Sequence, residues 1–308
     1  MARLILSRLA QSVVVIFGAL LISFLLAALA GNPARLIASS AFGFGPEQVQ
    51  LVEKQLGYGD PLPVRFAHFM GNAVTGDFGL SYRSRDSALG LVFDALPNTL
   101  ILVACALLLA LAVAVPLAIF SVLRREQPVD RALRSSLVFA QGMPEFWLAL
   151  VLVLLFSVNL GLLPSLGFDG PSALVLPTIA LAIPLVPAFV RLTRGALLDV
   201  MSLEFITTVR AKGLPEHEVV IRHGLRNALP SLVTFLALQI GWLIGGTIIV
   251  EQVFSWPGMG TLALDAVRNR DLAIIQAIVV VTALVYVLMN LAADVLAALL
   301  DPRIRVEH

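Results

Sequence analysis

The dominant pattern along the chain is a series of long apolar stretches separated by short polar segments. A helix needs roughly 20 apolar residues to cross the hydrocarbon core of a membrane, because each residue rises only about 1.5 Å. Stretches of this kind occupy residues 9–30, 98–123, 136–158, 174–190, 229–250 and 272–296. The pattern therefore predicts an all-α polytopic membrane protein with six transmembrane helices.

Two of these stretches need a closer look. The first follows Arg3 and Arg8 and could be mistaken for a signal peptide, but its length of 22 residues exceeds the roughly 7–15 of a signal core. We therefore expect an uncleaved transmembrane helix within residues 1–30. The fourth is interrupted by three prolines, at positions 177, 184 and 187. Each proline removes a backbone donor and favours a kink, which fits a path-lining span and a packing kink equally well.

Composition agrees with the pattern and narrows the class. Hydrophobic residues make up 59% of the chain and charged residues only 13%, whereas a soluble domain carries about 25% charged residues. This excludes a soluble enzyme, a disordered chain and a nucleic-acid binder that depends on a basic surface. The single cysteine, Cys105, excludes an intrachain disulfide and a cysteine-based metal site.

The distribution of basic residues predicts the orientation. If the N-terminus is cytoplasmic, fourteen of the 21 arginines and lysines lie on the cytoplasmic side. Five of the other seven lie in one long outer loop, where basic residues have little influence on topology. Both termini are therefore expected in the cytoplasm.

Two loops are long enough to carry a function. The outer loop, residues 31–96, contains a possible amphipathic helix at residues 46–56, a turn at residues 58–61 and a second break at GDFG, residues 76–79. A loop of this length either folds back on the protein or meets a partner. The residues alone do not decide between these two.

The second loop connects the fourth and fifth stretches and is basic. Residues 203–212 can form a helix with Phe205, Val209 and Lys212 on one face. Gly213 is placed to end this helix in a left-handed conformation, and Pro215 to begin a second helix through about Arg226. The result is either a rigid knob that projects into the cytoplasm or an amphipathic element on the membrane surface.

At these residues the chain resembles a known family. TVRAKGL (208–214) with RHGLRNA (222–228) is similar to the cytoplasmic EAA loop of binding-protein-dependent ABC importer permeases, in the dipeptide/oligopeptide group. Further blocks agree in order along nearly the whole chain: GDFG (76–79), LPNTL (96–100), GTIIVEQVFSWPGMG (246–260), NRD (269–271) and LDPRIR (300–305). The chain most resembles the B-type subunit, which carries the longer outer loop.

The resemblance implies a type I ABC importer permease fold and a domain plan. It places an N-terminal helix in residues 1–30, an extracytoplasmic region in 31–96, a permease core in 97–297 and a cytoplasmic tail in 298–308. The coupling loop would span about 194–228. Where the family has Glu-Ala-Ala, this chain has Thr207, Thr208 and Val209, so the contacts of the family's glutamate are in doubt.

The resemblance also implies a function and partners. The chain would be the permease subunit of an ATP-driven importer in the bacterial inner membrane. Its partners would be a second permease subunit as a heterodimer, two ATPase subunits, an extracytoplasmic substrate-binding protein and membrane lipid, with no nucleic acid. ATP and Mg would bind the ATPase subunits, because neither Lys54 nor Lys212 completes the Gly-Lys-Ser/Thr of a phosphate-binding loop. We expect no cofactor and no catalytic residue on this chain.

Two sets of residues are candidates for the transport mechanism. The first would dock on the ATPase: Phe205, Val209, Arg210, Ala211, Lys212 and Gly213. The second would line the path or form an outer gate, because polar residues inside a membrane are often functional: Gln239, Thr247, Glu251, Trp256 and Pro257. For Gln239, a helix–helix hydrogen bond is an equal alternative.

Other functions have less support in the residues. All four histidines lie outside the apolar stretches and show no paired spacing, so we expect no metal site. A secondary transporter is disfavoured because the spans carry few charges and no convincing repeat. Peptides are the expected substrates, with nickel, glutathione or another small ligand as the alternative.

Overall fold

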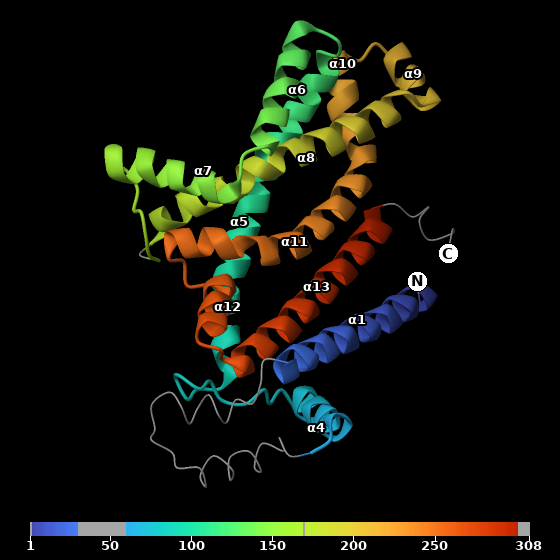
Figure 1. Ribbon diagram of the computed structural model, residues 1–308. Coiled ribbons are helices and arrows are strands. Elements are labelled where there is room, and N and C mark those ends of the chain that lie inside the picture. The colour runs from blue at the N-terminus through green and yellow to red at the C-terminus, as the bar shows by residue number, and fades with distance from the viewer. Residues whose placement is uncertain (1, 30–59, 169, 301–308) are drawn as a thin grey trace. The chain divides into compact units, whose positions relative to one another are not determined.

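A computed structural model describes residues 2–29, 60–168 and 170–300. These residues are almost entirely helical and contain one isolated antiparallel bridge, between Leu80 and Ser87 (Figure 1). Within the described ranges, five helices are long and apolar enough to cross a membrane, and one bent helix pair raises the number to six if it counts as one span. The expected all-α polytopic class is therefore confirmed.

The chain divides into two compact units, described here separately. One unit comprises Met1–Pro97 with Thr261–Val287, and the other Asn98–Gly260 with Leu288–His308. The helices α5 (Ala88–Leu123), α12 (Met259–Arg268) and α13 (Leu272–Leu300) contribute residues to both units.

In the first unit, α1 (Ala2–Leu29) packs against α4 (Leu62–Thr75). Phe24 of α1 contacts two rings of α4, with ring centroids 5.2 Å from Phe66 and 5.7 Å from Phe69. Helix α4 ends at Gly76 with a φ of 78°, a left-handed conformation that glycine adopts without strain. The break expected at residues 76–79 is thereby confirmed, whereas α4 itself was not predicted. The helix expected at residues 46–56 lies outside the described residues.

Two short polar side chains fix the helix starts of this unit. Ser87 precedes α5 and its hydroxyl accepts a hydrogen bond from Gly90 N, at 3.4 Å. Asp271 precedes α13 and accepts from Ile274 N, at 3.4 Å. Its other carboxylate oxygen accepts from the Ser81 hydroxyl at 2.7 Å and from Tyr82 N at 3.0 Å. Asp271 therefore joins the segment before α5 to the start of α13.

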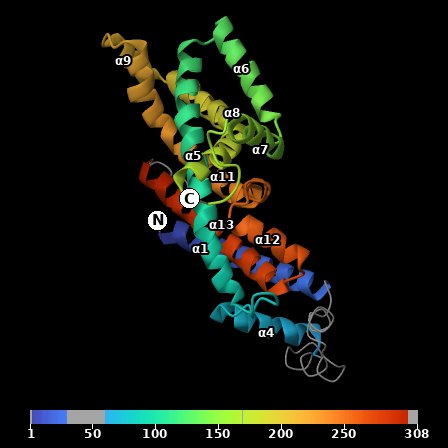
Figure 2. The ribbon, with the colours of Figure 1, turned by 90° about the vertical axis from the view of Figure 1, so that its left-hand side faces the viewer.

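The second unit is built around α8 (Val175–Met201). This helix contacts α6 (Pro128–Gln141), α7 (Glu145–Leu152) and α11 (Arg226–Phe254), and α6 lies beside it in both ribbon views (Figure 2). The largest apolar core lies among these helices and α5, and includes the fully buried Leu102, Leu181, Phe189 and Leu243. Phe189 meets Phe235 of α11 edge to face, with ring centroids 5.2 Å apart.

The third and fourth expected spans differ from the prediction. The third stretch, expected as one span over residues 136–158, is divided between α6 and the α7 segment, which meet at 95°. Gly142 ends α6, and Pro144 disfavours helical backbone at the residue before it, so the helix cannot continue through. In contrast, α8 is one helix with Pro184 and Pro187 inside it, and it extends past the expected end at residue 190 to Met201.

Candidate functional site

The α8–α11 loop, residues 202–225, contains the first set of candidate residues. It consists of α9 (Glu204–Ala211), a corner at Gly213, α10 (Glu216–Glu218) and the π-helix η3 (Val219–Leu225). Gly213 has a φ of 78°, so the expected left-handed end of the first helix is confirmed. The second helix does not end near Arg226 as expected, because α10, η3 and α11 form one continuous helix of 39 residues.

Helix α9 is held by an apolar contact that the sequence reading missed. Ile206 is fully buried and packs with Val200 of α8 and Val219 of η3, while Val209 lies half-buried beside them. Phe205, which was expected on the same face as Val209, has 40% of its surface exposed. The predicted face is therefore divided. Val209 packs inward, and Phe205 remains available on the surface with the exposed residues Ala211 and Lys212.

An ion pair closes the Gly213 corner. Arg210 donates from Nε to Glu216 Oε2 at 3.1 Å and from Nη2 to Glu216 Oε1 at 2.6 Å. This two-point geometry suits the planar guanidinium and connects α9 to α10. The hydrogen bond from Arg210 lowers the pKa of the Glu216 carboxyl, so the pair stays ionised at neutral pH and is lost only as the pH falls through that lowered value.

Most of the second set of candidate residues surrounds a turn after α11, which we call the Trp256 turn (residues 255–260). Glu251 is fully buried at its base. The carboxylate accepts a hydrogen bond from the Thr99 hydroxyl at 2.7 Å and another from Gly260 N at 2.7 Å. The Thr99 hydroxyl in turn accepts from Met259 N at 2.8 Å. A helix of the core and the returning chain are thus joined through one buried carboxylate.

The indole of Trp256 anchors the other side of this turn. Its side chain is 1% exposed, and its Nε1 donates to Asn98 O at 3.0 Å. The Asn98 side-chain amide donates to Pro257 O at 2.7 Å, so one asparagine holds the turn through its backbone carbonyl and its side chain. Phe168 packs edge to face on the indole, with ring centroids 4.8 Å apart. The turn is therefore a rigid part of the second unit.

The remaining candidates lie in different surroundings. Thr247 is fully buried and its hydroxyl donates to Ile244 O at 3.3 Å, within α11. Pro257 is exposed and Gln239 is half-buried. The structure brings together Glu251, Trp256 and Pro257. Gln239 lies 12 residues before Glu251 on α11, which is roughly 18 Å along the helix.

We expect Thr99→Val to weaken the Trp256 turn. Valine preserves the shape but removes one hydrogen bond to Glu251 Oε1 and leaves Met259 N without its Thr99 acceptor, and an unsatisfied buried N–H costs about 1–3 kcal/mol. The thermal unfolding midpoint of the purified chain in detergent should fall. Thr234→Val is the control, because that exposed hydroxyl bonds only to Pro230 O of its own helix. Equal midpoints for the two variants would contradict the role of Thr99.

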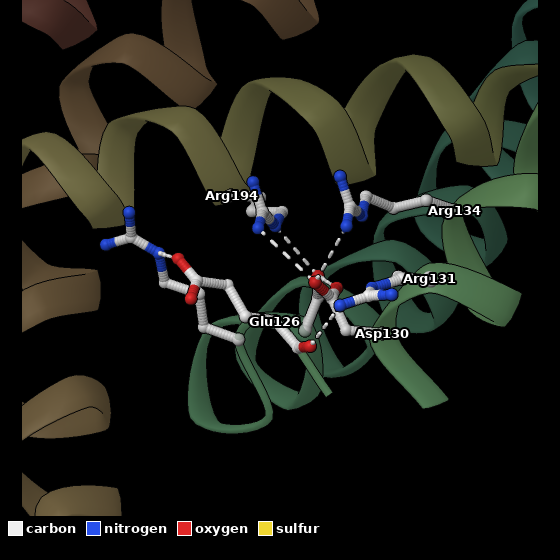
Figure 3. A network of polar contacts seen from close by, with 7 residues as sticks. Glu126, Asp130, Arg131, Arg134 and Arg194 are labelled. Carbon is white, nitrogen blue, oxygen red and sulfur yellow. Dashed lines mark hydrogen bonds and ion pairs between the residues drawn. The ribbon is translucent and has the colours of Figure 1, made fainter. Parts of the chain in front are cut away.

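A second buried acid joins three helices of the same unit (Figure 3). Asp130 of α6 is fully buried and accepts a hydrogen bond from the Ser121 hydroxyl of α5. Arg194 of α8 donates from Nε to Ser121 Oγ at 2.8 Å, and its Nη2 lies 3.5 Å from Asp130 Oδ2. Arg134 lies 3.4 Å from the same oxygen. Sequence reasoning counted these arginines only as an orientation signal and did not identify Asp130 or Ser121.

These features define a class of protein before any relative is considered. In the part of the chain that the structure describes, an almost entirely helical fold with several apolar spans is typical of a membrane subunit of a transporter. Comparison with known families agrees. Residues 114–306 match the family "Binding-protein-dependent transport system inner membrane component", and residues 1–103 match the corresponding N-terminal family. The chain belongs to this family, and is a multi-pass protein of the bacterial inner membrane.

Individual relatives support this assignment. The chain is 40% identical to the glutathione transport system permease protein GsiC of Escherichia coli (strain K12), over 90% of each chain. It is 36% identical to the oligopeptide transport system permease protein AppB of Bacillus subtilis (strain 168), over 99% of each chain. Among solved structures, it resembles the MetNI methionine ABC transporter in an inward-facing conformation, with a TM-score of 0.59 and 19% identity over 68% of this chain and 96% of that chain. That likeness shows a shared fold.

A metal site has no support in the described part of the chain. In residues 2–29, 60–168 and 170–300, no group of three or more histidine, cysteine, aspartate or glutamate side chains is placed to hold a metal ion. The absence of a metal in the whole protein stays a prediction.

Proposed function

We propose that this chain is the permease subunit of an ATP-driven importer for dipeptides or oligopeptides, with both termini in the cytoplasm. It forms the translocation path with a second, different permease subunit. Two ATPase subunits bind ATP and Mg, and an extracytoplasmic binding protein delivers the substrate. This chain carries out no catalysis. The observation that carries the proposal is the structure of the α8–α11 loop. The loop exposes the apolar side chains of Leu203 and Phe205, and it continues directly into the spanning helix α11.

Two named relatives favour a peptide substrate. One transports glutathione and the other oligopeptides, and both substrates are short chains of linked amino acids. Nickel or another small ligand is the second candidate class. The described polar side chains of α11 give no charged site for a metal complex, because Glu251 is buried beneath the Trp256 turn.

The exposed part of α9 fits a groove on an ATPase subunit. Leu203 is 50% exposed and Phe205 is 40% exposed, although both are large and apolar. Buried apolar anchors with a polar rim are typical of protein interfaces, and Arg210 and Lys212 would form that rim. The Arg210–Glu216 pair and buried Ile206 would hold Leu203 and Phe205 in place. A displacement of α9 by the ATPase subunit would then be transmitted to α8 and α11.

Reconstitution tests the function as a whole. The complete complex in proteoliposomes should accumulate a labelled oligopeptide only when ATP and the binding protein are both present. Uptake by this chain without ATPase subunits would overturn the proposal in favour of a secondary transporter.

Phe205→Glu should weaken the docking of the ATPase subunits. The substitution places a charge where we expect a buried ring, without touching the contact of Ile206 that holds α9. Less ATPase should co-purify with a tagged chain. His217→Glu is the control, because it places the same side chain at an exposed position of α10, outside α9 and its Phe205 face. Equal recovery of ATPase with the two variants would contradict docking through this face.

A further inference from the structure

Arg194 lies near the end of α8, a short distance along the chain from the α8–α11 loop. It stands seven residues, or about two turns, before the end of α8 at Met201, and α9 begins only at Glu204. Ser121 lies close to the end of α5 at Leu123, and Asp130 lies in the first turn of α6. One guanidinium therefore contacts the ends of two other helices immediately before the chain enters the loop.

The contacts are buried although they are made by charged groups. Asp130 and Ser121 are both 0% exposed, and Arg194 has only 21% of its side chain exposed. Arg134 and Arg194 lie at ion-pair distance from Asp130 Oδ2 without hydrogen-bond geometry, so they attract this oxygen by charge. The directional bonds run from Arg194 to Ser121 and from Ser121 to Asp130. A buried carboxylate that loses such partners is strongly disfavoured, which resists separation of the three helices.

An apolar contact on the same end of α8 connects this cluster to the loop. Leu197 of α8 is fully buried and packs with Val220 of η3, and Ile119 and Val122 of α5 lie against the same group. Gly224 of η3 is close enough that an added Cβ would lie 3.3 Å from Leu197 Cδ2. The ends of α5 and α8 and the start of the α10–α11 helix are therefore packed together, and the polar cluster adds α6.

We propose that Ser121, Asp130 and Arg194 form a clamp that makes the ends of α5, α6 and α8 move as one body with the α8–α11 loop. This inference rests on the proposed function and deepens it. When an ATPase subunit displaces the loop, the clamp transmits the displacement to three helices instead of allowing α8 alone to bend. Arg194 and Asp130 are positioning residues, because they act through the loop and contact no substrate.

The chemistry of Arg194 makes the proposal specific. Its Nε bonds Ser121 while its Nη2 pairs with Asp130, so two different nitrogens of one planar group hold two helices. Lysine has a single ammonium group on a flexible stem and cannot reproduce this fixed fork, although it keeps the positive charge that orients the membrane spans. Arg194→Lys should therefore break the clamp while it keeps the positive charge that contributes to membrane orientation.

The test uses the complete transporter in proteoliposomes, with peptide uptake and ATP hydrolysis measured on the same preparation. Arg194→Lys and Ser121→Ala should assemble normally and hydrolyse ATP in response to the binding protein. Uptake per ATP hydrolysed should fall several-fold for Arg194→Lys and less for Ser121→Ala. Arg125→Lys is the matched control, because Arg125 pairs with Glu126 on the surface with side chains 60% and 80% exposed. Its ratio should be unchanged.

The outcomes are distinguishable. An unchanged ratio of uptake to hydrolysis in Arg194→Lys overturns the clamp and leaves the proposed function standing. Loss of assembled complex in Arg194→Lys and Ser121→Ala, with a normal ratio in the part that assembles, also overturns it, since the residues would then serve stability alone. If the wild-type complex shows no uptake dependent on ATP, the proposed function itself fails.

Discussion

Gly260→Ala is expected to destabilise the second unit strongly. A Cβ at this position would lie 2.6 Å from the Cα of Ile248 and 2.8 Å from Glu251 Oε2. The first of these atoms belongs to the backbone of α11 and cannot rotate away. The turn must therefore shift, and the hydrogen bond from Gly260 N to Glu251 is lost.

The expected cost combines two effects. Overpacking a close contact costs about 1–3 kcal/mol, and losing one hydrogen bond to a charged group adds about 1.5–3 kcal/mol. The thermal midpoint and the yield of assembled complex should both fall. Gly245→Ala is the matched control, because a Cβ there meets nothing within 4 Å and α11 should gain up to about 1 kcal/mol of helix propensity. Similar midpoints for the two variants would show that the Trp256 turn is not closely packed.

Gly213→Val should abolish most transport while the spans remain folded. The φ of 78° is accessible to glycine but makes a β-branched residue a clear outlier, at a cost of roughly 1–3 kcal/mol. An added Cβ meets nothing within 4 Å, so the effect comes from the backbone alone. The corner must change its angle, which moves Arg210 away from Glu216 and re-aims Phe205.

Uptake and ATPase co-purification measure this effect. The Val variant should insert normally, because residue 213 lies outside the large apolar core, and should lose uptake dependent on ATP. Gly213→Asn is the informative control, since asparagine enters the left-handed region far more readily than valine. Retained uptake in the Asn variant identifies the backbone conformation as the cause. Full activity of the Val variant would contradict a coupling role for this corner.

The spans could be predicted from sequence because length and apolar content alone decide whether a helix can cross a membrane. Their ends could not. Helix α5 begins at Ala88, ten residues before the expected residue 98, and α8 continues eleven residues past 190, because helical hydrogen bonds do not stop at the membrane surface. The bend at Gly142 and Pro144 was missed because the apolar stretches on its two sides were read as one span, although residues 141–145 (QGMPE) interrupt the apolar pattern.

The local parts of the candidate site were also predictable, and the long-range parts were not. Gly213 was identified because a glycine between two helices commonly ends the first helix in a left-handed conformation. Ile206 was missed because eight residues of α9 carry too little periodicity to distinguish its inner face from its outer face. The Thr99–Glu251 bond joins residues 152 positions apart, and no pattern in either neighbourhood indicates the other. Asp130 was missed for the same reason, because its partner Arg194 is 64 residues away in the sequence.

The π-helix η3 has a consequence for how α9 is aimed. A π-turn usually holds one residue more than the α-turn it replaces, and each residue of an α-helix turns the chain by about 100°. The orientation of Glu216 relative to Arg226, at the start of α11, therefore differs from the orientation that the two residues would have in an unbroken α-helix. The direction in which the Gly213 corner points depends on a residue count within η3. Removing one residue there would rotate the Gly213 corner by about 100° relative to α11, so that it would point in a different direction.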